Sequence, residues 1–243
     1  MTTVTADTTA SFFARFPELS DEAIESAAQR LSAEFEAFDG RSISAPVPVE
    51  SIAEHFLGYQ IEISDEGLFA DPDYLGGIVF SENLIQVNAS VEANEGRYNF
   101  TIAHELGHHV LHREIYLAAS SENASNILCR DTFEKPLIEV QADRFAAALL
   151  MPADKMALAV DATENPKRLV SPRAVRGYAA AVARSGNFTN VSNTAMVNRL
   201  IDLGYLSEAA YQRGTSHDFS RRSRPSISGA IWRLYNRVRR RLK

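Results

Sequence analysis

The chain has 243 residues and a mass of 26.8 kDa, with 45% hydrophobic and 23% charged residues. This composition supports one or two hydrophobic cores and excludes collagen-like, wholly disordered and coiled-coil chains. The net charge of -6 is unevenly distributed along the chain. Residues 213–243 are basic, with ten Lys or Arg and one acid, while the other 212 residues are acidic, with 15 bases and 30 acids.

The sequence shows no membrane or secretion signal. No apolar run approaches the roughly 18 residues that a membrane-spanning helix needs, and residues 1–10 lack the charge and the apolar stretch of a secretory leader. We therefore expect a cytoplasmic protein. Cys129 is the only cysteine, so it forms no internal disulfide and is expected to be a small buried hydrophobe.

The first third of the chain predicts a helix, a second helix and a strand. After a polar start at residues 1–10, which we expect to be disordered, residues 20–38 have a Ser20 cap, early acids and helical apolar spacing, and Gly40 ends them. A Pro-led helix follows at 49–56, and a Gly stop separates it from a strand at 60–63. This order begins a mixed α+β domain.

Two β-rich runs at residues 75–80 and 84–88 come next. Ser81, Glu82 and Asn83 separate them, which suits a hairpin with a three-residue loop. A helix is then predicted from about residue 95 to 112, and it is followed by a less regular stretch from 113 to 135.

The helix at 95–112 contains the pattern HExxH at residues 104–108. Two histidines four residues apart lie only ~40° apart around a helix and ~6 Å along it, so both imidazoles can meet one ion. Glu105 can lean over the open side of that ion and take a proton from its bound water, as the general base does in zinc hydrolases. His109 and His112 do not share this geometry and are expected to be packing or surface histidines, with a residual chance of a role behind a ligand.

A hydrolytic zinc needs a third protein ligand and one open position. The best candidate is Glu139, in the helix predicted from Pro136 to about Leu150, which an apolar stripe would pack on the HExxH helix. Asp143 lies on the same face and could accept the N–H of a ligand histidine, or be the ligand itself. The alternative is that both are ordinary solvated acids.

At these residues the chain resembles the ImmA/IrrE family of bacterial metallopeptidases. The resemblance covers about residues 45–155 and rests on the hairpin, TIAHELGHHVLH and EVQADRFAAALLMP in that order. It implies a small gluzincin-like fold with one zinc ion held by His104, His108 and Glu139, Glu105 as catalytic base, and Asp143 behind the ligands. It also implies a site-specific protease that cuts a helix-turn-helix repressor and so releases a stress-response or mobile-element operon.

The oxyanion-stabilising group and the substrate strand remain open at this stage. A Tyr, His or Arg usually supplies the first. The candidates are Tyr98, Tyr116, Arg144 and His217. The strand at 84–88 is either an edge on which an extended substrate pairs or a strand that serves only the sheet.

The region beyond residue 160 is predicted to be mainly helical. Helices are expected at 171–183 and 192–203. The second resembles the helix-turn-helix-like segment that follows the peptidase in this family. It carries only one Arg and one Asp, so it lacks the basic face of a DNA-binding helix, and we expect it to pack or to position the substrate. The tail interleaves apolar residues with arginines, which suits weak nucleic acid binding, a membrane surface or packing on the acidic body.

Together these patterns predict an α+β fold: a zincin-like domain, with a short antiparallel sheet packed on the HExxH helix and a second ligand helix, followed by a helical region. The expected segments are 1–40, 41–160, 161–212 and 213–243. The expected function is a zinc-dependent endopeptidase acting on a DNA-binding repressor. The alternative is a non-enzymatic regulator or toxin-antitoxin component, which would have no use for a base beside an open metal position. Manganese or iron could replace zinc in the cell.

Overall fold

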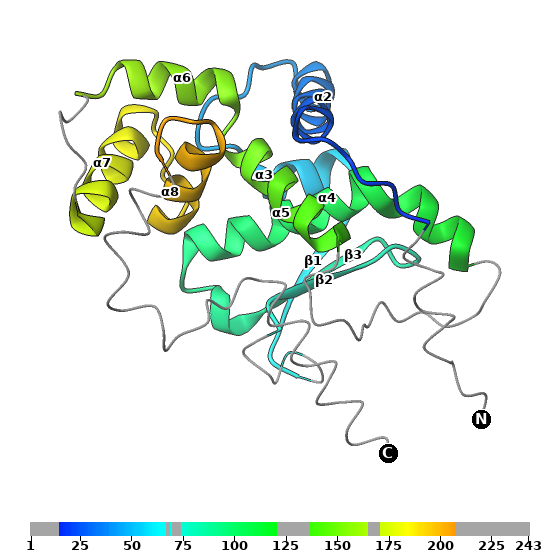
Figure 1. The fold of residues 1–243 in the computed structure, drawn as a ribbon. Helices are drawn as coiled ribbons and strands as arrows, with labels where there is room; N and C mark the ends of the chain where they lie inside the picture. The colour runs from blue at the N-terminus through cyan, green and yellow to red at the C-terminus, as the bar shows by residue number, and fades with distance from the viewer. Residues whose placement is uncertain (1–14, 67–68, 70–73, 121–136, 165–170, 208–243) are drawn as a thin grey trace.

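The computed structural model describes residues 15–66, 69, 74–120, 137–164 and 171–207. Its architecture is α+β, as the sequence predicts: a small sheet, a long central helix, and further helices on the other side of that helix (Figure 1). The predicted disordered start, Cys129, His217 and the basic tail lie outside the described residues.

The predicted first helix is α2, Asp21–Asp39. The Ser20 side chain accepts a hydrogen bond from the backbone N–H of Ala23, which caps the N-terminus. Gly40 ends the helix in the left-handed conformation, with φ of 74°, where a side chain would be strained. Its buried face carries Ile24, Leu31 and other apolar residues into the core.

The predicted second helix is real but changes its winding. It begins as α3, Val49–Ser51, and continues as a π-helical turn, η1, over Ile52–Phe56. The backbone N–H of Leu57 donates to the carbonyl of Ile52, five residues back, which widens the turn before β1 begins.

Three strands form the sheet: β1, Gln60–Ser64; β2, Gly76–Val79; and β3, Leu84–Asn88. β2 and β3 form the predicted antiparallel hairpin, and Asn83 closes its loop at a φ of 49°. β1, however, pairs with β3 in parallel, so the strand order is β1-β3-β2 and the sheet is mixed. The expectation of an antiparallel sheet is wrong in this respect, because strand periodicity says nothing of which neighbour a strand takes.

The same topology corrects the role suggested for residues 84–88. β3 is the central strand, and its backbone groups pair on both sides. It therefore offers no free edge to an extended substrate, and β2 occupies one of the two edges instead.

The central helix α4, Glu95–Ser120, runs between the sheet and the helices α5 and α2 (Figure 1). A short 3-10 turn, η3 at Ala89–Val91, connects β3 to it. α4 extends beyond the predicted end at residue 112, since residues 113–120 contain no Gly or Pro to stop it. α5, Leu137–Leu150, crosses α4 closely, and a Cβ at Gly107 would lie 3.1 Å from the Cα of Ala142.

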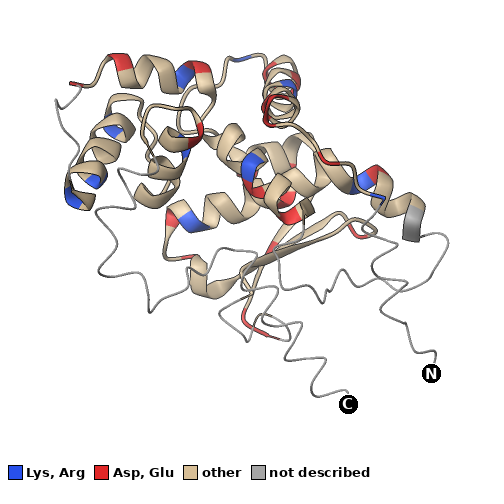
Figure 2. Cartoon of the chain, viewed as in Figure 1, with Lys and Arg blue, Asp and Glu red and all other residues tan. Residues whose placement is uncertain are grey.

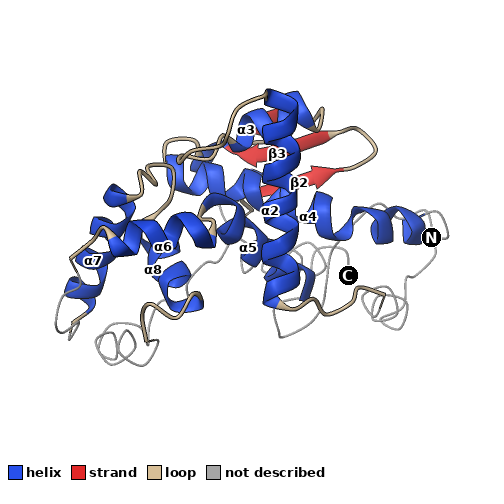
Figure 3. Ribbon diagram, turned by 90° about the horizontal axis from the view of Figure 1, so that it is seen from above, coloured by secondary structure: helices blue, strands red, loops and turns tan. Residues whose placement is uncertain are grey.

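The remaining helices are α6, Ala153–Asp161; α7, Pro172–Ser185; and α8, Asn193–Asp202. The side chains of Ser171 and Ser192 cap the N-termini of the last two. These helices gather at one end of the molecule, away from the sheet (Figure 3). One hydrophobic cluster nevertheless runs from Ile24 to Leu206. The segment boundaries at 40, 160 and 212 stay predictions.

Charges are unevenly spread over the described helices (Figure 2). α2 carries six acids and one arginine, whereas α7 carries three arginines and no acid. Of the helices in the described part of the chain, none combines the length and apolarity that a membrane span requires.

Candidate metal centre

Helices α4 and α5 bring three side chains together. His104 and His108 come from one face of α4, Glu139 comes from the first turn of α5, and one ligand atom from each lies within 4.8 Å of the others. The two imidazole Nε2 atoms are 3.1 Å apart. Glu139 places Oε2 3.2 Å from Nε2 of His104 and Oε1 3.4 Å from Nε2 of His108.

These separations suit a tetrahedral cation. Zinc holds nitrogen and oxygen ligands at about 2.0–2.1 Å, so neighbouring ligand atoms around it lie about 3.3 Å apart. Two imidazoles and one carboxylate are also a donor set of hydrolytic zinc sites. The three side chains therefore fit a divalent metal with one position left for water.

His104 is fully buried and is held by Asp143. Its Nδ1 lies 2.8 Å from Oδ1 of Asp143, on the side of the ring opposite the cluster. Burial lowers the pKa of His104, but the hydrogen bond to Asp143 and the nearby carboxylates of Glu139 and Glu105 outweigh it and raise that pKa to about 10. Asp143 thus contacts His104 on the ring edge opposite the cluster and is not one of the three residues that could hold a metal ion.

One carboxylate oxygen of Glu139 lacks a hydrogen-bond partner. Its Oε2 is buried and lies 3.2 Å from Nε2 of His104, but no donor reaches it with the geometry of a hydrogen bond. Burial raises the pKa of Glu139, but the nearness of His108 and His104 lowers it well below its ordinary value, so the carboxylate stays charged. A charged oxygen facing imidazole lone pairs is stable only with a cation or a proton among them.

Glu105 lies beside the cluster rather than in it. Its side chain is on α4 and is 2% exposed, and burial raises its pKa. The side chain points toward β2, where a Cβ added to Gly76 would lie 3.3 Å from Oε1 of Glu105. A buried carboxylate with a raised pKa beside a metal position suits proton transfer.

The two other histidines of α4 differ from each other. Nδ1 of His109 lies within hydrogen-bond distance of the Tyr59 hydroxyl, at 2.8 Å, which is a packing role. His112 is 3% exposed, and its Nδ1 lies 3.1 Å from Nδ1 of His108 while its Nε2 lies 2.9 Å from Oε1 of Gln141. The sequence carries no signal for Gln141, because an isolated Gln in a helix matches no ligand pattern.

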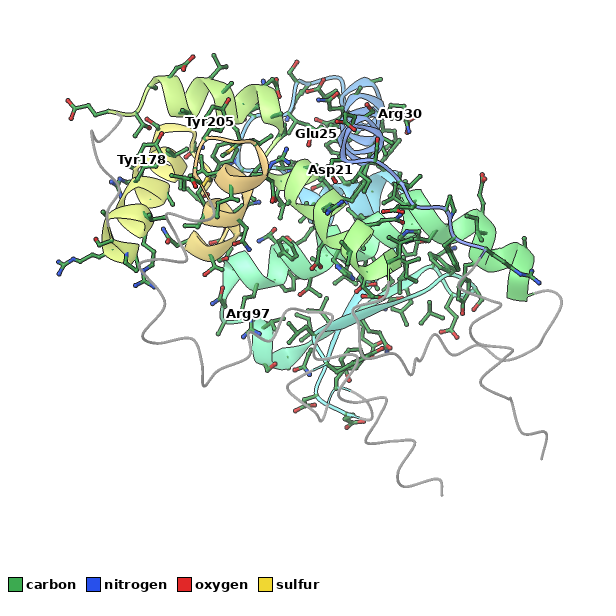
Figure 4. All side chains as sticks on the ribbon, in the orientation of Figure 1. Asp21, Glu25, Arg30, Arg97, Tyr178 and Tyr205 are labelled. Carbon is green, nitrogen blue, oxygen red and sulfur yellow. The ribbon has the colours of Figure 1, made fainter. Side chains whose placement is uncertain are left out.

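Three of the four candidates for oxyanion stabilisation lie in the described part of the chain, and each of them contacts a group outside the cluster. The Tyr98 hydroxyl donates to Glu50, the Tyr116 ring packs on Phe80, and the Arg144 guanidinium donates to Asp21 of α2. Figure 4 shows Asp21 on α2, on the side that faces α5. His217 lies outside the described residues.

One comparison with known proteins bears on this site. Residues 65–183 match a peptidase family model described as the IrrE N-terminal-like domain. No curated protein and no solved structure matches the chain. The matched range contains β2, β3, α4 and α5, and so every side chain of the cluster.

Proposed function

Since the chain belongs to the ImmA/IrrE family, whose peptidase domain it carries over residues 65–183, we propose that it is a zinc-dependent endopeptidase that cleaves a protein substrate. The observation that supports this most is the convergence of His104, His108 and Glu139 on one point. Glu105 on the same helix then serves as the catalytic base, and Asp143 orients His104.

The bound metal would polarise the scissile carbonyl and lower the pKa of a water molecule toward ~7. Glu105 would take the proton from the attacking water and pass it to the leaving amine, for which a pKa above the ordinary glutamate value is favourable. Asp143 accepts the Nδ1–H of His104 and so keeps Nε2 free to bind the metal.

The extended substrate would pair along β2. This strand lies at the edge of the sheet and packs on α4, with Gly76 beside Glu105. Backbone pairing at an edge holds a peptide next to the catalytic base without demanding a particular sequence. We propose, from the family resemblance, that the substrate is a helix-turn-helix repressor.

The test is to incubate the zinc-loaded protein with the repressor encoded beside it. A cut that a chelator abolishes supports the proposal. His104→Ala and Glu139→Ala should lose both the metal, measured by elemental analysis, and the cleavage. Full metal loading with no cleavage of the repressor or of a proteome-derived peptide library would instead favour a non-enzymatic regulator.

A further inference from the structure

A chain of hydrogen bonds leads from the ligand cluster to the segment before α2. Nδ1 of His108 lies 3.1 Å from Nδ1 of His112, and Nε2 of His112 lies 2.9 Å from Oε1 of Gln141. Nε2 of Gln141 donates to the backbone carbonyl of Pro17 at 2.9 Å. This series of hydrogen bonds thus runs from α4 to α5 and ends on the segment that precedes α2.

The carbonyl of Pro17 fixes the direction of every bond in this chain. A carbonyl only accepts, so the Gln141 amide nitrogen donates to it and the amide oxygen accepts from Nε2–H of His112. A neutral His112 then has its lone pair on Nδ1 and accepts from Nδ1–H of His108. His108 is left with its lone pair on Nε2, the atom that faces His104 and Glu139.

The surroundings keep His112 neutral and in place. His112 and Gln141 are 3% and 1% exposed, and the buried Phe16 ring packs edge-on against the imidazole at 5.7 Å between centroids. A buried imidazole keeps a positive charge only beside a counter-ion, and the two nitrogens of His112 face the His108 ring and the Gln141 amide oxygen instead. The ring therefore has one donor and one acceptor, and the structure uses both.

We propose that His112 is a positioning residue for the metal centre: it accepts the Nδ1–H of His108 and so holds the tautomer and ring orientation that direct Nε2 of His108 to the metal. Gln141 and the backbone of Pro17 hold His112 in turn, which makes the segment before α2 a support of the site. The inference rests on the proposed function for the identity of the metal. Such supports behind ligand histidines are worth about 10–100-fold in metal affinity.

The test compares three variants by Zn²⁺ affinity, measured in competition with a chromophoric chelator. His112→Phe keeps an aromatic ring but removes the acceptor, so its affinity should fall by about 10–100-fold. His112→Asn places an amide oxygen near the position of Nδ1 and should recover most of that loss. His109→Phe is the matched control, since His109 bonds to Tyr59 instead of a ligand, and it should bind Zn²⁺ like the unaltered protein.

Nitrogen-15 NMR of the metal-free protein supplies a second readout. His108 should carry its proton on Nδ1 in the unaltered protein and in His112→Asn, and should mix tautomers in His112→Phe. Unchanged affinity and tautomer in a folded His112→Phe protein would overturn the proposal, as would an equal loss in His112→Asn. An unaltered protein that binds no Zn²⁺ defeats the proposed function, whereas the NMR result still decides whether His112 positions His108.

Discussion

Glu105 and Glu139 are both carboxylates in the same small volume, yet their surroundings move their pKa values in opposite directions. Burial dominates at Glu105 and raises its pKa. At Glu139 burial also raises the pKa, but two histidines outweigh it and lower the pKa well below its ordinary value. Glu105, which takes up a proton readily, therefore suits the role of a general base, and Glu139, which stays charged, suits the role of a metal ligand.

Replacing Glu105 by Gln separates these two roles. Glu105→Gln should keep the metal, because residue 105 is not among the three proposed ligands, but cleavage should fall by about 10²–10⁴-fold because the amide takes up no proton. Elemental analysis and the chelator-sensitive cleavage assay measure the two effects. A Glu105→Gln protein of full activity would contradict the assigned mechanism.

The raised pKa of His104 makes metal binding dependent on pH. With a pKa of about 10, His104 holds a proton in the metal-free protein at pH 7.5, and a metal must displace it. Binding should therefore release about one proton from this site, and apparent affinity should rise as pH rises from 6.5 to 8. Calorimetry in buffers of different ionisation enthalpy measures the release. Asp143→Asn, which removes the strongest contact that raises this pKa, should reduce it.

At the scale of elements, the site depends on how closely other elements approach α4. Gly107 lets α5 approach on one side, and Gly76 lets β2 approach on the other. A Cβ at Gly76 would lie 2.3 Å from Cγ2 of Thr101 and 3.2 Å from the carbonyl oxygen of Gln86. The added Cβ therefore has no room between the backbone of β3 and the side chain of Thr101 on α4.

Gly76→Ala should therefore destabilise the protein by about 1–3 kcal/mol and lower cleavage by moving β2 relative to Glu105. Gly177→Ala is the matched control, because a Cβ there meets nothing within 4 Å and residue 177 is inside helix α7. It should stabilise the protein by about 0.5–1 kcal/mol. Urea unfolding measures both, and equal effects would refute the packing argument.

Two arginines join other helices to acids of α2, in different surroundings. Figure 4 labels these two acids, Asp21 and Glu25, on α2. Arg199 of α8 pairs with Glu25 at 2.7 Å and also donates to the carbonyl of Met151, and its side chain is 6% exposed. Arg144 of α5 pairs with Asp21, and its side chain is 51% exposed. Solvent screens only the second pair strongly.

Arg199→Leu should cost about 3–5 kcal/mol of unfolding free energy, because it leaves Glu25 and a backbone carbonyl without their partner. Arg144→Leu, the same change at the exposed pair, should cost about 0–1 kcal/mol. Denaturant unfolding of the two variants tests the difference. A loss at residue 144 as large as that at residue 199 would contradict it.

At the scale of the whole molecule, the metal site lies within one continuous core. The hydrophobic cluster includes residues of α2, the sheet, α4, α5, α7 and α8, and Arg199 links α8 to α2 across it. The helical end and the ligand helices therefore share their packing. We expect the described residues to unfold in one cooperative step.

Removing the metal should lower the stability of this whole unit. At a free Zn²⁺ concentration 100 times the dissociation constant, binding stabilises the folded state by about 2.7 kcal/mol. Calorimetry with Zn²⁺ and with chelator should show a single transition that shifts to lower temperature on chelation. A second transition whose temperature does not change with zinc would indicate that the helical end unfolds separately.

The sequence by itself determined the helices and hairpin, the α+β class, and the residues that could hold a metal. Caps, glycine stops and apolar spacing act over a few residues, and HExxH fixes two side chains on one helix face. Only the tertiary structure decided that β1 joins β3 in parallel, that β3 has no free edge, and that Glu139 meets both histidines. It also revealed the path through His112 and Gln141 to Pro17, since contacts between residues 124 positions apart depend on packing that no local pattern encodes.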